Sequence, residues 1–179
     1  MARLHIRKAR QADLELMAAI DHKCAAGYAY KMEEILDKSG SSHSFQRVRL
    51  PRTATINYPR EGDDLFRSWA KAEMIFVGLV EEELVAYTTL ETALLPRTAR
   101  VVDLVVAKDA RRSGVGASML AACEAWAREK KLKRLLVEAQ LRNDPIISLL
   151  KKAGYVMCGY LESYFPNSDT AVFFEKRLG

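Results

Sequence analysis

The sequence predicts a mixed α/β (α+β) fold in one domain, and three observations carry that prediction. The chain has 179 residues, the length of a single domain. Its β-prone segments first follow one another as in an antiparallel sheet and then alternate with helical patterns. With 49% hydrophobic and 28% charged residues, the composition is that of a globular protein and excludes disordered, collagen-like and coiled-coil chains.

The N-terminal segments predict one strand and three helices. Leu4-His5-Ile6-Arg7 alternates between apolar and polar residues, as a strand does. Helical spacing predicts a helix over 12–26, a short helix over 28–38 that stops at Ser39-Gly40-Ser41-Ser42, and another over 65–72.

The middle of the chain contains a predicted hairpin and one ambiguous segment. Residues 43–60 allow extended structure, although two prolines there favour edges or turns. Strands over 74–80 and 84–94 flank the charged turn Glu81-Glu82-Glu83 and predict a hairpin. We expect these glutamates to be solvated, because three consecutive side chains cannot converge on one metal ion.

From residue 97 onward, predicted strands and helices alternate. The helix over 114–131 has the strongest pattern, because its apolar residues fall on one face. The elements in order are a Val-rich strand over 97–107, the helix over 114–131, a strand over 135–139, a helix over 145–153 closed by Gly154, a strand from Tyr155, and a last strand over 170–177.

The net charge of +5 is concentrated in one quarter of the chain. Between Lys108 and Lys152 there are eleven Lys/Arg and five Asp/Glu, whereas the remainder has seventeen basic and eighteen acidic residues. This excess predicts an anionic partner: nucleic acid, a membrane surface or a phosphorylated small molecule. No aromatic residues interleave the basic ones as in a base-stacking platform, which disfavours nucleic acid.

The cysteines and the N-terminal segment indicate a reducing compartment. Cys24, Cys123 and Cys158 are odd in number and far apart, so we expect neither a disulfide framework nor a zinc site. Met1–Arg10 lacks the apolar core of a secretory signal, and no stretch is apolar for long enough to cross a membrane. We therefore expect a cytoplasmic protein without a membrane partner.

The turn Arg111-Arg112-Ser113-Gly114-Val115-Gly116-Ala117 joins the Val-rich strand to the strongest helix. Its glycines allow close approach of a ligand, and the unpaired N–H groups of a helix N-terminus attract anions. The pattern therefore predicts an anion cradle, although it is neither a P-loop nor a dinucleotide-binding G-x-G-x-x-G. The alternative is a tight turn whose glycines only relieve crowding.

The order of these motifs resembles the GNAT superfamily of N-acetyltransferases. The R-x-x-G-x-G/A turn after a Val-rich strand, followed by Asn143 and Ala153-Gly154-Tyr155, carries the resemblance, which extends over about Val77–Leu178. Further segments are similar to streptothricin acetyltransferases: Val102-Asp103-Leu104, Asn143-Asp144-Pro145, Gly154-Tyr155 with Cys158-Gly159, Ala171–Leu178, and the N-terminal Arg47–Pro51.

The resemblance implies a central mixed, mostly antiparallel sheet of about seven strands with helices on both faces. It implies one N-acetyltransferase domain over 1–179, with a variable acceptor-side region over 24–72 and an acetyl-CoA-binding core over 98–155. The implied reaction is direct attack of a small-molecule primary amine on the thioester of acetyl-CoA, with a streptothricin-like antibiotic, and hence antibiotic resistance, as one candidate.

The alternatives are a protein lysine or N-terminal acetyltransferase and a non-catalytic acyl-CoA sensor. A nucleic-acid-binding module has the least support. The acceptor, the acyl-chain length and the oligomeric state stay open, and a homodimer is compatible with the sequence.

The resemblance also implies which residues bind the coenzyme. The main chain of the Val-rich strand would pair with pantetheine, and the N–H near Val106 would stabilise the oxyanion. Asn143 would bind the pantetheine amide, or it would instead cap the helix that begins at Pro145. The candidates are Leu104, Val105, Val106, Arg111, Arg112, Ser113, Gly114, Val115, Gly116, Ala117 and Asn143.

Catalysis requires a group that takes the proton of the amine, since only about one alkyl amine in 10³ is neutral at pH 7. Asp103 is the first candidate, as the only acid in the Val-rich strand, and Glu138 is the second. Asp103 could instead meet solvent or a buried Arg. Leu150 occupies the position where the family often has a Tyr acid. A thiol with a pKa of about 8.5 can leave as thiolate without an acid, and Tyr160 or Tyr164 could substitute as the donor. The alternative for each tyrosine is a packed strand residue.

The remaining polar candidates have no assigned chemistry. His5, His22 and His43 lie far in sequence from the motifs and lack metal-ligand spacing, so we expect surface or structural roles and no metal.

Overall fold

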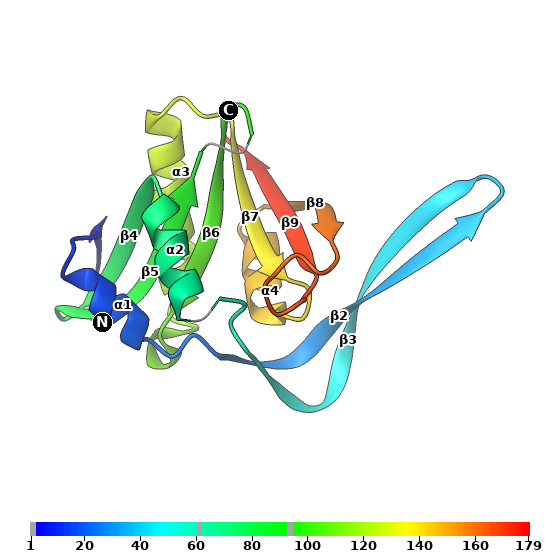
Figure 1. Ribbon diagram of the computed structural model, residues 1–179, viewed down its shortest axis with the longest axis horizontal. Coiled ribbons are helices and arrows are strands. Elements are labelled where there is room, and N and C mark those ends of the chain that lie inside the picture. The colour runs from blue at the N-terminus through cyan, green and yellow to red at the C-terminus, as the bar shows by residue number, and fades with distance from the viewer. Residues whose placement is uncertain (1–2, 61, 93–94) are drawn as a thin grey trace.

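The computed structural model describes residues 3–60, 62–92 and 95–179, and it confirms the mixed α/β fold (Figure 1). Seven strands form one sheet in the order β1-β4-β5-β6-β7-β9-β8. Of the strand pairs in these residues, only β6–β7 is parallel. The strands are β1 (Leu4–Lys8), β4 (Met74–Val80), β5 (Glu83–Glu91), β6 (Thr98–Val106), β7 (Arg134–Gln140), β8 (Val156–Leu161) and β9 (Ala171–Arg177).

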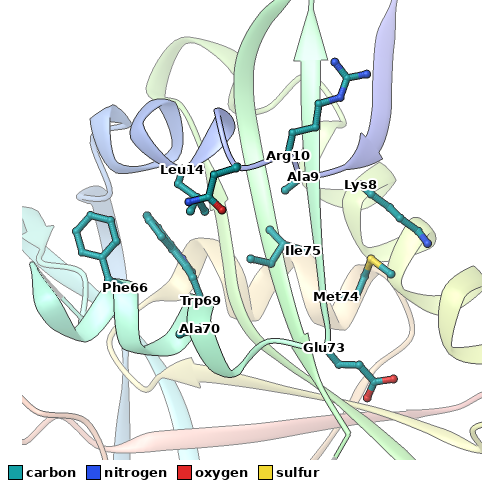
Figure 2. A pocket seen from close by; sticks show the side chains of 11 residues that line it. Lys8, Ala9, Arg10, Leu14, Phe66, Trp69, Ala70, Glu73, Met74 and Ile75 are labelled. Carbon is teal, nitrogen blue, oxygen red and sulfur yellow. The ribbon is translucent and has the colours of Figure 1, made fainter.

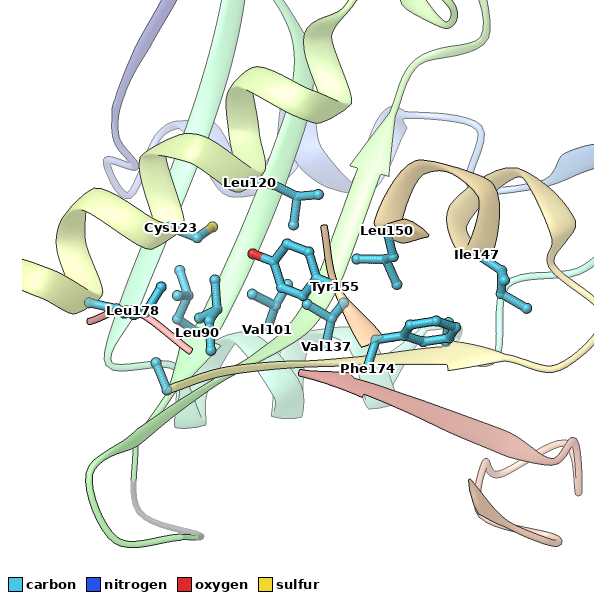
Figure 3. Packing of buried hydrophobic residues seen from close by; sticks show 14 of the residues in the cluster. Leu90, Val101, Leu120, Cys123, Val137, Ile147, Leu150, Tyr155, Phe174 and Leu178 are labelled. Atoms are coloured by element: carbon cyan, nitrogen blue, oxygen red, sulfur yellow. The ribbon is translucent and has the colours of Figure 1, made fainter. Parts of the chain in front are cut away.

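Helices cover both faces of this sheet, as expected. One face packs against Met17, Leu65 and Trp69 of the first two helices, and the other packs against Leu120, Leu150 and their neighbours on the last two (Figure 3). The helices are α1 (Asp13–Ala19), α2 (Asp63–Lys71), α3 (Val115–Glu129) and α4 (Asp144–Lys152), with a short 3₁₀ turn at Lys108–Ala110.

The predicted helix over 28–38 is wrong. This segment belongs to β2 (Cys24–Asp37), which pairs with β3 (Gly40–Ile56) in a separate two-stranded sheet that projects from the body (Figure 1). We call this hairpin the arm. Tyr28, Met32 and Leu36 are spaced as on one helix face, but every second residue of β2 also lies on one face of a strand, so the local pattern fits both structures.

Pairing across the turn decides between the two structures. Tyr28 lies opposite Arg49 and Met32 lies opposite Phe45, and the predicted stop at 39–42 is the hairpin connection. The predicted helix over 12–26 is also too long: α1 ends at Ala19, and Ile20 has an extended ψ of 135°. The other elements match their predictions to within a few residues, apart from Ala93 and Leu94 of the predicted strand 84–94, which lie outside the described residues.

The gap between β6 and β7 positions the candidate site. The two strands pair only from Thr98–Val101 to Arg134–Val137, and beyond these residues they diverge. Next to the divergence, the β5–β6 register shifts so that Val102 is an extra residue in β6. The shift directs Asp103 toward α2, whereas Leu104 packs on the α3 face.

Candidate active site

Two buried carboxylates lie where β6 and β7 diverge, and one arginine bridges them. Asp103 on β6 and Glu138 on β7 both contact Arg60, which comes from the segment between the arm and α2. Arg60 Nη1 is 3.1 Å from Asp103 Oδ1, and Nη2 donates to Glu138 Oε1. Burial lowers the pKa of Arg60, but the charges of the two carboxylates outweigh that effect and raise it above its ordinary value.

Asp103 is fully buried and accepts from three further side chains. Tyr58 Oη lies 2.5 Å from Oδ1, while Thr89 Oγ1 and Ser68 Oγ lie 2.7 Å and 2.9 Å from Oδ2. The structure therefore combines the two interpretations of Asp103: it meets a buried arginine, and it lies at the gap between the strands. An amine can reach it only through one of its partners.

Glu138 has its own set of donors. Arg100 Nη1 is 3.1 Å and Tyr164 Oη is 2.8 Å from Oε2. Burial raises the pKa of Glu138 above its ordinary value despite the opposing charges of Arg60 and Arg100. Burial and the Glu138 charge raise the pKa of Tyr164 to about 12, so its hydroxyl is protonated at neutral pH.

The structure thus brings Asp103, Glu138 and Tyr164 into one network but leaves Tyr160 outside it. Tyr160 lies on β8, with ring centroids 5.0 Å from His43 and 5.5 Å from Phe45 of the arm. Leu150 is fully buried in the core between α4 and the sheet (Figure 3).

Sequence reasoning missed three residues at this site: His22, Tyr58 and Arg60. His22 Nε2 is 2.7 Å from Tyr87 Oη, and its ring centroid is 5.1 Å from that of Tyr58. No motif marks them, because they meet only through tertiary contacts. They line a cavity of about 230 Å³ together with Ile20, Asp21, Lys23, Gly62 and Leu65.

Tyr58 connects this cavity to Asp103. Burial and the charge of Asp103 raise the pKa of Tyr58 well above its ordinary value, so the hydroxyl keeps its proton. A larger cavity of about 550 Å³ lies between α1 and α2 and is lined by Leu14, Phe66 and Ile75 among others (Figure 2). None of its lining residues belongs to the carboxylate network.

The glycine turn presents an uncapped helix N-terminus. Gly114 is the N-cap of α3 with φ 92°, a left-handed conformation, and its cap has no side-chain hydrogen bond. The first amides of α3, from Val115 to Ala117, are therefore available to an anion. A Cβ on Gly116 would lie 3.0 Å from Leu149 Cδ2, so this glycine also relieves crowding.

The polar residues of the turn make mostly internal contacts. Arg111 donates to three main-chain carbonyls, those of Val106 at 2.8 Å, Lys23 at 2.8 Å and Asp21 at 3.2 Å. Ser113 Oγ donates to Ala110 O at 2.7 Å, whereas Arg112 is exposed.

Asn143 caps α4, as the alternative interpretation predicted. Its Oδ1 accepts from Ile146 N at 3.3 Å, and Cys24 Sγ is 3.5 Å away. Any contact with a coenzyme would therefore have to come from the other atoms of this side chain.

The basic excess is not a single patch at the turn. Several of the basic residues lie at the other end of α3, about 22 Å away along a fifteen-residue helix. These are Arg128, Lys130, Lys131, Lys133 and Arg134. The charge of this region therefore supports anion binding at the turn only in part.

Residues 3–60, 62–92 and 95–179 contain no group of three or more His, Cys, Asp or Glu side chains that could hold a metal ion. No helix in the same ranges has the length and hydropathy needed to cross a membrane.

Comparison with known proteins gives a family match and structural neighbours. A family model described as "Acetyltransferase (GNAT) family" matches residues 43–155. No curated protein matches the chain.

The structural neighbours share the fold at low sequence identity. A nourseothricin acetyltransferase superposes with TM-score 0.82 and 18% identity, over 98% of this chain and 99% of the neighbour. A Bacillus anthracis str. Ames protein described as a streptothricin acetyltransferase, in complex with acetyl coenzyme A, gives 0.78 and 19% over 98% and 99%. The Escherichia coli ribosomal-protein-S18-alanine N-acetyltransferase gives 0.68 and 13% over 99% and 95%.

Proposed function

The chain belongs to the GNAT family of acetyltransferases, and from this premise we propose that it moves the acetyl group of acetyl-CoA to a primary amine of a small molecule. One observation carries the proposal. The uncapped N-terminus of α3, the open edge of β6 and the Tyr58–Asp103 pair beside a cavity all lie around the gap between β6 and β7.

The coenzyme is assigned to the β6 edge and the turn. Ala107 N donates to Val85 O, so alternate residues along β6, Leu104 and Val106, direct their main-chain groups away from β5 and toward the gap. Pantetheine would pair with these groups as an added strand, and the pyrophosphate would bind the first amides of α3. Arg111 uses the Val106 carbonyl, and the Val106 N–H is our candidate oxyanion donor.

The proton of the acceptor amine would leave through Tyr58. The ammonium donates to Tyr58 Oη while the phenolic proton moves to Asp103 Oδ1, 2.5 Å away. The neutral nitrogen then attacks the thioester carbon and forms the C–N bond, the C–S bond breaks, and the sulfur leaves as thiolate. The nitrogen loses a second proton as the amide forms, and this loss balances the proton that the thiolate takes up. Glu138, with its raised pKa, is the second candidate acceptor of the amine proton, and the protonated Tyr164 is a candidate donor to sulfur.

The acceptor would insert only its amine-bearing end. A cavity of about 230 Å³ holds a short alkyl amine and leaves the rest of a larger molecule outside. Streptothricin-like antibiotics are the favoured acceptors, because the neighbours named as a nourseothricin acetyltransferase and a streptothricin acetyltransferase align with almost the whole chain. The three free cysteines support a cytoplasmic location for this reaction, where thiols stay reduced.

Two alternatives remain for the test to separate. A protein N-terminal acetyltransferase is favoured by the fold shared with the S18-alanine enzyme. A non-catalytic acyl-CoA sensor is favoured by the four donors that enclose Asp103 and by the buried Leu150.

The test incubates the full chain with acetyl-CoA and, in parallel, a streptothricin, a short diamine, a lysine peptide and a peptide with a free N-terminus. Thiol release and product mass are measured together. We expect one acetyl group on the small amine. Turnover confined to the peptides would select the protein acetyltransferase, and tight coenzyme binding without turnover would select the sensor.

A further inference from the structure

The arm exposes apolar side chains at its outer end. Ile35 and Leu36 are 57% and 71% exposed. Among the described residues, β2 and β3 pair only with each other (Figure 1). A two-stranded hairpin is marginally stable alone in water and leaves two strand edges open. This region therefore has the properties of an unfilled interface.

Contacts with the body reach along the arm as far as His43, which lies opposite Glu34. Arg47 Nε is 2.6 Å from Asp144 Oδ1, and Lys151 Nζ donates to Tyr30 Oη at 2.9 Å. The last ring contacts are those of His43 and Phe45 with Tyr160. Ile35 and Leu36 lie beyond these contacts, and between Tyr28 and Glu34 the contacts with the body are made by side chains, which leaves the main-chain edge of β2 for another partner.

The β2 and β3 edges of the arm differ in how strongly they resist pairing with another strand. The register moves from Ala26 opposite Ala54 to Tyr28 opposite Arg49, which places Pro51 in an irregular part of β3. The charged residues of β3 are all arginines, so two β3 edges would repel each other. The β2 edge has no proline and carries both signs of charge. By the usual rules for strand edges, β2 is therefore the edge able to pair.

Symmetry restricts how two β2 edges could meet. Along each strand of an antiparallel pair, the main-chain N–H and C=O groups point alternately toward the partner strand and away from it. Residues that lie opposite each other in two copies of β2 must therefore both be odd-numbered or both be even-numbered. The two-fold axis must then lie between the two copies of one residue, which face each other. An axis at Lys31, Glu33 or Glu34 would place two like charges directly opposite each other.

An axis at Met32 gives the opposite result. Lys31 of each copy then lies opposite Glu33 of the other, at two equivalent positions. The same register places Ile35 opposite Ala29 and Leu36 opposite Tyr28, so the exposed apolar pair meets apolar neighbours. We propose that two copies of this chain join their β2 edges antiparallel about Met32, which makes a four-stranded sheet from two arms.

Sedimentation velocity of the full chain over a micromolar concentration series tests the proposal. We expect a dimer, and we expect Lys31→Glu or Glu33→Lys alone to weaken it about tenfold or more, because each variant sets like charges opposite each other twice. An equimolar mixture of the two variants should recover a heterodimer within about threefold of the original affinity. That recovery also shows that both variants are folded.

A cross-link tests the register. In a Cys158→Ser background, Met32→Cys should form an intermolecular disulfide on mild oxidation, because opposed Cα atoms in an antiparallel pair are roughly 4.5–5.5 Å apart. Gln46→Cys, on the β3 strand, is the matched control and should stay monomeric on a non-reducing gel. A monomer at every concentration, a dimer unaffected by either charge change, or a mixture no tighter than its components would overturn the proposal.

Discussion

Replacing Arg60 by Ala tests the most buried charge arrangement of the candidate site. The Arg60 side chain is 12% exposed, and its partners Asp103 and Glu138 are 0% and 1% exposed. Without Arg60, Asp103 keeps only neutral donors, those of Tyr58, Ser68 and Thr89. Glu138 keeps Arg100 as its cation, so the loss of Arg60 destabilises the charged form of Asp103 more than that of Glu138.

Removal of one partner from a buried ion pair costs about 3–5 kcal/mol. For a chain of this size, that loss lowers Tm by roughly 6–20 °C. The deficit should depend on pH with a definite sign. The charge of Arg60 lowers the pKa of Glu138 against the effect of burial, so its loss raises that pKa further in the folded state, and the folded variant binds a proton that the unfolded chain releases. Its deficit is therefore smaller at pH 5 than at pH 8.

Urea unfolding followed by tryptophan fluorescence at both pH values measures this loss. Arg67→Ala is the matched control, because its pair with Asp64 is 3.4 Å long and 72% and 43% exposed, and we expect a change below about 0.5 kcal/mol. A loss for Arg60→Ala below about 1 kcal/mol, or a deficit that grows toward acid pH, would refute this account of the network.

Three further predictions follow from the site and the core. Tyr58→Phe should lower kcat about 10²-fold or more in the thiol-release assay without weakening acetyl-CoA binding. The control Tyr160→Phe should leave kcat unchanged. Equal losses of kcat in the two variants would remove Tyr58 from the proton path. Gly116→Ala should destabilise by about 1–3 kcal/mol in urea unfolding, because its Cβ meets a leucine of α4 at 3.0 Å, whereas Gly159→Ala has open space and should cost less. Leu150→Ala should cost about 3–5 kcal/mol, and a loss under 1 kcal/mol would mean that the α4 face of the core is loosely packed.

The segments that were predicted correctly are those whose local pattern permits one structure. The β6 strand, the turn and α3 combine a Val-rich run, a glycine at a left-handed position and one apolar helix face, and these signals agree. Residues 28–38 satisfy both a helical and an alternating spacing. Pairing between Met32 and Phe45, thirteen residues apart, decides between them, and no local signal contains that contact.

The sequence suggests the carboxylates of the candidate site but not their partners. Asp103 and Glu138 stand out as acids in apolar strands, and Tyr164 is a candidate because of its hydroxyl. Tyr58 and Arg60 reach Asp103 across more than forty residues of chain, so their roles exist only in the folded protein.

The position of β9 in the sheet has a consequence for how the chain folds. β9 lies between β7 and β8, and β8 pairs with no other strand in the described residues. During synthesis β8 therefore emerges before β9, the strand with which it pairs. The main-chain groups of β8 stay hydrogen-bonded to water until β9 inserts beside β7. Translation can complete β1 through β7 as a nascent sheet, but the edge that carries β8 closes only after residue 177 has left the ribosome.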